Sequence, residues 1–579
     1  MQPRPSTHAR VALDVFELLL TPAGRYSEPP PSAAWSDAIA CSVPGTVAGA
    51  LARAGQLDLS NPLDLDAHDA WLRTRLPAAL PEGARHLVFE GLATLCDVWL
   101  DGRHQLRSET MFRPHEVACA APLKPGSELV LRCAALTPEL ARKRPRPRYR
   151  TRLVQAQQLR WLRTSLLGRM PGISPRIPVV GAYRPVYVEA RPQFALRDHS
   201  LSLSVVGTRA ELSLLLTLAP ERDERFSATL VLAGAAAEGR FPLTLSQEGE
   251  LVRLQTRCVL PEVALWWPHT HGPAPRSRAW VELSFAASDA RCTIELGQLG
   301  FRALGVDHGA DGQGFRLRVN DVPVFCRGAC WATDDLLFGS TERVRETLLR
   351  ARDAGMNMVR VGGTGAYESD AFYDACDELG ILVFHDFMFA NMDYPAQDEG
   401  FHAELQREAD QQLTRWQGRP SLAVLCGGSE VEQQAAMLGL SPELAKSELF
   451  YQLLPERARL HLPDVPYVPN SPSGGALPFQ VDAGIAHYYG VGAYLRPLGD
   501  ARVSRVRFAA ECLAFANVPR NSAIEALLGE LEAPFHHPRW KERVPRDRGA
   551  GWDFEDVRDH YLEQLYGAEA RQLRATDPE

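Results

Sequence analysis

Two glutamates stand where a pair of carboxylates could act on one bond. Glu430 follows the apolar run 422–426 after a Gly-Gly-Ser turn, and Glu511 follows the run 506–510. Short apolar runs of this length indicate strands, so both acids would lie at strand ends. Two carboxylates brought together can cleave a glycosidic bond, because one protonates the leaving oxygen while the other attacks the anomeric carbon.

Strand-end position alone does not single out this pair. Five other acids hold comparable places, namely Asp334, Asp335, Glu368, Asp386 and Asp393. An acid at a strand end usually lies at the surface or in a salt bridge. The residue pattern therefore leaves the choice among these carboxylates open.

The elements that would position the acids alternate between strand and helix after about residue 301. Apolar runs predict strands at 324–328, 357–361, 381–384 and 422–426. Helical periodicity predicts helices at 341–354, 370–379 and 401–417. Such alternation implies a parallel sheet, and the number of units favours a (β/α) barrel, whose reacting groups lie at the carboxyl ends of the strands.

The first 300 residues are predicted to be β. Period-two alternation at 128–133 indicates a half-buried strand, and repeated short strands up to about residue 193 indicate a first sandwich. Further short strands over 194–300 suit an immunoglobulin-like sandwich. The Arg- and Pro-rich stretch 137–178 is predicted to be a long loop that leaves the first sandwich.

Composition excludes several function classes. The net charge of −8 and the pI near 6.1 give no reason to expect nucleic-acid binding, and the arginines are expected to form a solvated surface. The 11 cysteines are scattered, and the lone pair Cys326 and Cys330 lacks the further ligands of a zinc site, so reduced thiols are expected. Without a signal peptide or an apolar run of about 20 residues, we expect a cytoplasmic chain that does not contact a membrane.

Several longer motifs occur in a fixed order along the chain. The most specific are 356–361, 367–380, 386–390 and 419–432. Shorter ones lie at 43–46, 89–94, 181–186, 265–269 and 300–302. Together they resemble glycoside hydrolase family 2, and within it the β-mannosidase-like branch. The resemblance implies a sugar-binding-type jelly roll at 1–193, an immunoglobulin-like sandwich at 194–300 and a catalytic TIM-type (β/α)8 barrel at 301–579.

The resemblance also implies roles for individual residues. Glu430 matches the acid/base position on the fourth strand, and Glu511 matches the nucleophile position on the seventh. Arg360 matches a second-strand arginine that keeps the nucleophile ionised, since a neighbouring cation lowers the pKa of a carboxylate. The segment 487–489 matches the sixth strand, where a tyrosine commonly hydrogen-bonds the nucleophile, and Tyr489 is the candidate.

These roles predict a retaining exo-β-glycosidase whose partner is a β-linked carbohydrate. No metal or organic cofactor is expected. The acid and the nucleophile would lie about 5–5.5 Å apart. Besides Arg360 and Tyr489, the candidate substrate-binding residues are His487, Ser429 and Trp331, whose ring could form a stacking wall. For Trp331 and Tyr489, packing in the core near the barrel mouth is the alternative interpretation.

The sequence also departs from the family pattern. Ser429 replaces the usual asparagine before the acid/base, the segment 361–365 lacks the usual tryptophan, and 168–173 shows no tryptophan–aspartate insertion. These changes weaken the prediction of mannose specificity and keep open a carbohydrate-binding or catalytically inactive relative. No apolar strand is predicted after Glu511, so a truncated barrel that lacks its last strand is expected.

Overall fold

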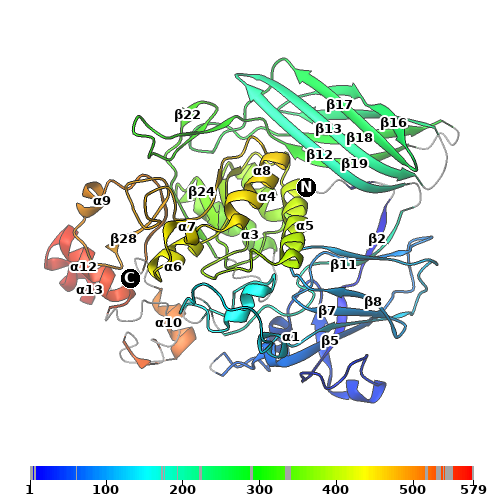
Figure 1. Cartoon of the computed structure of the whole chain (residues 1–579), viewed down its shortest axis with the longest axis horizontal. Helices are drawn as coiled ribbons and strands as arrows, with labels where there is room; N and C mark the ends of the chain where they lie inside the picture. The colour runs from blue at the N-terminus through cyan, green and yellow to red at the C-terminus, as the bar shows by residue number, and fades with distance from the viewer. Residues whose placement is uncertain are drawn as a thin grey trace.

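The computed structural model describes residues 4–576, with gaps at 6–7, 60, 171–173, 175, 192–193, 221–224, 287–290, 333–340, 515–518, 530–535, 539 and 541–551. Figure 1 shows two β-sandwiches on one side of the molecule and a mixed α/β region beside them. The C-terminal helices lie on the far side of that region. Among the described helices, none has both the length and the apolar character needed to cross a membrane.

The first sandwich consists of two antiparallel sheets around one apolar core. The six-stranded sheet has the order β4 (Ile39–Ser42), β3 (Val15–Pro22), β5 (His68–Arg75), β10 (Glu128–Cys133), β7 (Cys96–Leu100) and β8 (Arg103–Ser108). The four-stranded sheet has the order β2 (Ala9–Ala12), β11 (Val186–Ala190), β6 (His86–Phe89) and β9 (His115–Ala118). Helix α1 (Val47–Arg53) packs beside β4, and its N-cap Thr46 accepts the Gly49 N–H at 3.0 Å.

The sequence predicted one face of strand β10 to be exposed to solvent, and the structure shows that face covered. Strand β10 was expected to be half-buried, but Val130 on its outer face is only 2% exposed. Trp71 and Trp99 from the neighbouring strands pack with Val130 in a second apolar cluster. The large aromatic rings therefore cover the face that alternation assigns to solvent.

The second sandwich consists of a four-stranded and a five-stranded antiparallel sheet. The four-stranded sheet contains β12 (Phe194–Val206), β13 (Arg209–Pro220), β17 (Leu251–Leu260) and β16 (Thr244–Glu248). The five-stranded sheet contains β1 (Arg4–Pro5), β19 (Arg291–Leu299), β18 (Ser277–Phe285), β14 (Phe226–Gly234) and β15 (Gly239–Pro242). Every second residue of β13 from Leu212 to Leu218 is buried, as a strand with one face on the core requires.

The α/β region follows a small antiparallel sheet of β20 (Leu304–Asp307), β21 (Arg316–Val319) and β22 (Val322–Pro323). Its main sheet is parallel, in the order β23 (Gly328–Trp331), β24 (Met358–Val361), β25 (Leu382–Asp386), β26 (Leu422–Cys426) and β27 (Tyr467–Val468). A separate parallel pair consists of β28 (Ala486–Gly492) and β29 (Ala509–Leu513). The larger helices are α3 (Thr341–Asp353), α4 (Asp370–Leu379), α5 (Glu399–Arg415), α8 (Leu454–His461), α10 (Asn521–Leu528), α12 (Phe554–Tyr566) and α13 (Glu569–Thr576). The short helices are α2 (Thr137–Leu140), α6 (Val431–Met437), α7 (Pro442–Ala445) and α9 (Asp500–Val503).

Sequence reasoning located most of these strands but misplaced the first. The strand predicted at 324–328 begins only at Gly328, where β23 pairs in parallel with Met358 of β24. The TIM-type barrel that lacks its last strand stays a prediction, because the described parallel strands of this region form one sheet of five and one separate pair. The two sheets do meet, since the Cys330 thiol on β23 lies 3.6 Å from the carbonyl oxygen of Ala510 on β29.

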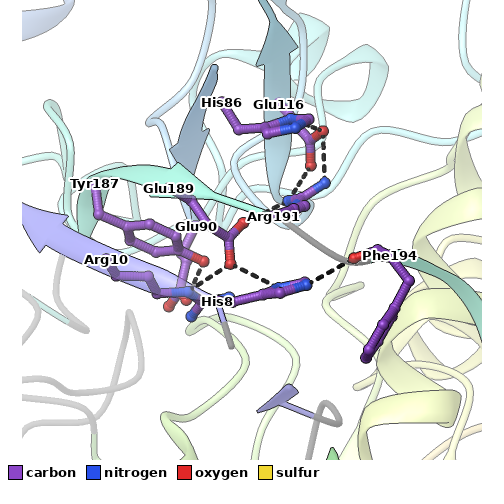
Figure 2. A network of polar contacts seen from close by, with 9 residues as sticks. All are labelled: His8, Arg10, His86, Glu90, Glu116, Tyr187, Glu189, Arg191 and Phe194. Atoms are coloured by element: carbon purple, nitrogen blue, oxygen red, sulfur yellow. Dashed lines mark hydrogen bonds and ion pairs between the residues drawn. The ribbon is translucent and has the colours of Figure 1, made fainter. Parts of the chain in front are cut away.

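A polar network ties the first sandwich to the start of the second (Figure 2). Its centre is Glu189, whose side chain is fully buried and whose carboxylate contacts His8, Arg10 and Arg191 at 3.2, 2.8 and 2.6 Å. The second ring nitrogen of His8 bonds the carbonyl oxygen of Phe194 at 3.0 Å. Burial would raise the pKa of Glu189, but the hydrogen bond from His8 and the charges of Arg10 and Arg191 outweigh it and lower the pKa to about 2.

We expect Glu189→Gln to destabilise this sandwich by about 3 kcal/mol, because it removes one partner of a network whose carboxylate is fully buried and leaves Arg10 and Arg191 without their counter-charge. For a domain of this size the melting temperature should fall by roughly 6 to 12 °C, measured by calorimetry at pH 7. Glu116→Gln is the matched control. Glu116 also accepts from Arg191, but its side chain is 36% exposed, so the loss should be clearly smaller.

The sign of the pH dependence gives a second check on the Glu189 network. The folded-state pKa of Glu189 is depressed, so its contribution is present above pH 4.5 and is lost as the pH falls toward 2. The difference in melting temperature between wild type and Glu189→Gln should shrink over that range. If Glu189→Gln and Glu116→Gln lowered the melting temperature equally at pH 7, the burial of Glu189 would not explain the effect.

Candidate active site

The carboxyl ends of the parallel strands bring six of the seven predicted site residues together. Arg360 lies on β24 and Ser429 and Glu430 follow β26. His487 and Tyr489 lie on β28, and Glu511 lies on β29, where it is the register partner of His487. Sequence analysis placed Glu511 after its strand, whereas the structure places it within the strand.

Glu511 is held from two sides. The Arg360 guanidinium donates to Oε1 of Glu511 at 2.6 Å, and the Tyr489 hydroxyl donates to Oε2. Arg360 is itself buried and also donates to Asp386 at 2.6 Å and to the Ser429 hydroxyl at 3.2 Å. These contacts fix the orientation of the Glu511 carboxylate.

The same contacts keep Glu511 ionised. Burial alone would raise the pKa of the Glu511 carboxyl, but His487, Arg360 and the Tyr489 hydroxyl together hold it well below its usual range. The pKa of Asp386 shifts in the opposite direction. Complete burial of this carboxyl raises its pKa despite the contact with Arg360. Of the two carboxylates on Arg360, Glu511 is therefore the one that its surroundings favour as an anion.

Glu430 sits at the start of α6 in an unusual backbone conformation. Its φ of +55° places it in the left-handed region, which a residue with a side chain rarely adopts. The backbone N–H of Glu430 donates to the Ser471 carbonyl at 2.8 Å, and Gln433 donates to its Oε1 at 3.0 Å. Strained conformations of this kind cluster at functional sites, where the surrounding structure holds them in place.

His487 joins the two glutamates. Its Nδ1 lies 2.9 Å from Oε1 of Glu430 and 3.5 Å from Oε2 of Glu511, while its Nε2 contacts the Ser471 hydroxyl at 2.9 Å. The two carboxylates therefore offer oxygens within 4.8 Å of one another. This donor set also resembles a metal site, but both oxygens of Glu511 already accept hydrogen bonds. The arrangement suits proton handling by two carboxylates and an imidazole.

Trp331 lies apart from this cluster. Its indole N–H donates to Glu368 at 2.9 Å, and its ring packs against Phe372 with centroids 5.0 Å apart. The half-buried ring also lines a cavity of about 490 Å³ with Cys330 and Met356. These contacts match the core-packing alternative, and the stacking role of Trp331 stays a prediction.

The other strand-end acids have separate partners. Asp386 contacts Arg360, Glu368 contacts Trp331, and Asp393 binds Arg148 at 2.7 Å. Asp334 and Asp335 lie outside the described residues. Sequence analysis missed Gln433 and Ser471 as partners of the glutamates. Neither carries a sequence signal, since a glutamine and a serine in these positions have many possible neighbours.

Comparisons with known proteins agree with this architecture. Residues 27–169 match a family model described as glycosyl hydrolase 2 galactose-binding domain-like. The chain is 29% identical over 430 residues to β-mannosidase B of Thermothelomyces thermophilus, covering 69% of this chain and 48% of that protein. It is 29% identical over 444 residues to β-mannosidase B of Aspergillus niger, covering 72% and 51%. The chain thus spans about half the length of the curated relatives that it matches.

Solved structures show the same fold. A β-D-mannosidase from Dictyoglomus thermophilum superposes with a TM-score of 0.79 at 22% identity, covering 97% of this chain and 71% of that chain. An exo-chitosanase from Amycolatopsis orientalis superposes with a TM-score of 0.66 at 17% identity, covering 96% and 65%. The two sandwiches, the parallel α/β region and the ordered sequence matches have one consistent explanation. The chain is similar to glycoside hydrolase family 2 in its N-terminal domain and in its fold, and its homologues are β-mannosidase-like.

Proposed function

We propose that this chain is a retaining exo-β-glycosidase that hydrolyses β-mannosides. Glu511 attacks the anomeric carbon and forms a glycosyl ester, while Glu430 gives its proton to the leaving oxygen. Glu430 then takes a proton from water as the water displaces Glu511, which restores both carboxyl groups. Two inversions at the anomeric carbon leave the product in the β configuration.

The observation that carries this proposal is the close pairing of two carboxylates in different surroundings. One oxygen of Glu430 and one of Glu511 lie within 4.8 Å of each other, which favours the separation of about 5–5.5 Å of a retaining pair over the about 6.5–9.5 Å of an inverting pair. Arg360 and Tyr489 contact only Glu511 of the two, which favours Glu511 as the anion that attacks. Glu430 is then the group left to carry the proton.

Three further parts of the proposal concern the barrel, the cell compartment and the sugar. We infer that β23 to β29 belong to one (β/α) barrel, because Arg360 on β24 and Cys330 on β23 both contact β29. We also assign the chain to the cytoplasm, because none of its 11 cysteines forms a disulfide. The β-mannoside preference follows the names of the relatives.

The test is a panel of 4-nitrophenyl β-glycosides, with the mannoside expected to be turned over fastest and the glucoside, galactoside and glucosaminide compared beside it. Proton NMR of early product should show the β anomer. Release of the α anomer first would contradict double displacement. If no glycoside is hydrolysed but calorimetry shows binding of a manno-oligosaccharide, the chain is a carbohydrate-binding relative instead.

A further inference from the structure

A basic strip runs along the segment that leaves the first sandwich and crosses the α/β region; in Figure 1 it lies in the cyan part of the chain. Residues 142–152 contain seven cations and no acid. The members of the strip are Arg142, Lys143, Arg144, Arg146, Arg148, Arg150 and Arg152. Although the whole chain carries a net charge of −8, this segment is strongly positive.

Three arginines of the strip are available to a ligand. Arg142 and Arg144 pair with Glu139, and Arg148 pairs with Asp393. Those remaining, Arg146, Arg150 and Arg152, are exposed. Among the described residues, no carboxylate forms an ion pair with any of these three.

Two buried side chains fix the strip beside the catalytic pair. The Tyr149 hydroxyl donates to the Val431 carbonyl at 3.0 Å, and the Thr151 hydroxyl donates to Gln434 at 3.1 Å. Val431 and Gln434 belong to α6, the helix that begins directly after Glu430. Arg150 and Arg152, on either side of Thr151, therefore belong to a segment anchored on the helix that follows the acid/base candidate, the residue that would protonate the leaving group.

A cavity of about 670 Å³ continues from the strip. Its lining includes Arg146, Trp161, Lys446 and Tyr451. The volume falls within the ~300–1,000 Å³ range of small-ligand sites, and aromatic rings beside planar polar groups suit a saccharide.

Most of the acids in this cavity are already engaged. Asp393 binds Arg148, and Glu448 accepts from Gln397 at 2.6 Å. Asp398 caps α5 by accepting the Phe401 N–H at 2.8 Å. Glu443 is the remaining acid of the lining. Two cations of the lining, Arg146 and Lys446, form no ion pair among the described residues and can contact a ligand.

We propose that the strip and the cavity bind an anionic saccharide on the leaving-group side of the scissile bond. The preferred substrate then carries a carboxylate or a sulfate on that sugar, since a guanidinium pairs with either through two parallel hydrogen bonds. This inference rests on the proposed glycosidase function. A nucleic acid is the less favoured polyanion, because the chain as a whole is acidic and the strip adjoins the catalytic pair.

The test compares matched disaccharides in which a β-mannosyl unit is linked to glucose, to glucuronate or to glucose 6-sulfate. We expect wild type to prefer the two anionic substrates in kcat/KM. The triple variant Arg146→Ala, Arg150→Ala, Arg152→Ala should reduce this preference roughly five- to thirty-fold, and 0.5 M NaCl should reduce it in wild type. The lysine triple variant, which keeps the charge but loses the paired hydrogen bonds of the guanidinium, should fall between wild type and the alanine variant. Because the preference is a ratio, a partly unfolded variant does not imitate the effect.

Several outcomes would overturn the inference. An equal preference in wild type and the alanine variant would do so, as would no preference at all. If the nitrophenyl glycosides show no turnover, the proposed function fails, and calorimetry with a glucuronate-containing tetrasaccharide then tests the strip by itself. Binding that the alanine variant loses supports the strip, and no binding overturns it. Tighter binding of a single-stranded oligonucleotide than of the acidic saccharide also overturns it.

Discussion

Replacing Glu511 by glutamine is expected to lower kcat/KM for nitrophenyl β-mannoside by a factor on the order of 10⁴ to 10⁶, as removal of a hydrolase nucleophile does. Glutamine keeps the shape of the side chain and can still contact Arg360, but its neutral amide does not form the glycosyl ester. Initial rates at high enzyme concentration measure the residual activity. Glu248→Gln, which changes an exposed acid of the second sandwich, is the control and should retain wild-type rates.

Chemical rescue separates loss of the nucleophile from loss of the fold. Glu511→Ala opens space beside Arg360, and added azide should occupy it and attack the anomeric carbon directly. A single displacement inverts the configuration, so the expected product is the α-mannosyl azide. Hydrolysis by Glu511→Gln at more than a tenth of the wild-type rate would show that another group is the nucleophile.

The pH profile follows from the surroundings of Glu511. His487, Arg360 and Tyr489 hold its pKa well below the usual range of a glutamate, and only the ionised form attacks. The acid limb of kcat/KM should therefore lie below pH 4.5, and activity should fall only as the pH approaches the depressed pKa. Tyr489→Phe removes one of the stabilising hydrogen bonds and should move this limb to higher pH.

Several elements of the α/β region could be predicted from the sequence, because residues close in the chain determine where they begin and end. The helix at 370–379 and the strand at 422–426 were predicted with the bounds that the structure shows. Gly380 ends that helix with a φ of +68°, and a Cβ there would come within 2.6 Å of the His269 backbone nitrogen. A clear apolar period and a glycine stop are local signals, so they are readable from the sequence.

The arrangement of the site depended on contacts that the sequence does not carry. Strand-end position left seven acids open, and only the family resemblance selected Glu430 and Glu511. The structure adds that one imidazole, His487, contacts both of them. That contact depends on β28 and β29 pairing with His487 opposite Glu511, which periodicity alone does not determine. The exposed β23 was misplaced because the run 324–326 that precedes it is more apolar than the strand itself.

Replacing Glu430 is expected to have an effect that depends on the leaving group. Nitrophenolate leaves without a proton, so Glu430→Gln should slow cleavage of nitrophenyl β-mannoside far less than cleavage of methyl β-mannoside. For the methyl glycoside the loss should approach 10⁴, the upper end of what general acid catalysis contributes. Rates for a series of aryl glycosides, plotted against the pKa of the leaving phenol, should show a steeper slope in the variant than in wild type.

Glu432→Gln is the matched control for this result. Glu432 lies two residues further along the same helix, and it accepts from Tyr451 at 2.6 Å rather than from His487. Its replacement should leave the slope of the plot unchanged, because a change in packing slows all substrates by a similar factor. A steeper slope in Glu432→Gln, with the wild-type slope in Glu430→Gln, would show that Glu432 and not Glu430 is the acid/base. A steeper slope in Glu430→Gln alone would tie the proton to the carboxylate that shares His487 with Glu511.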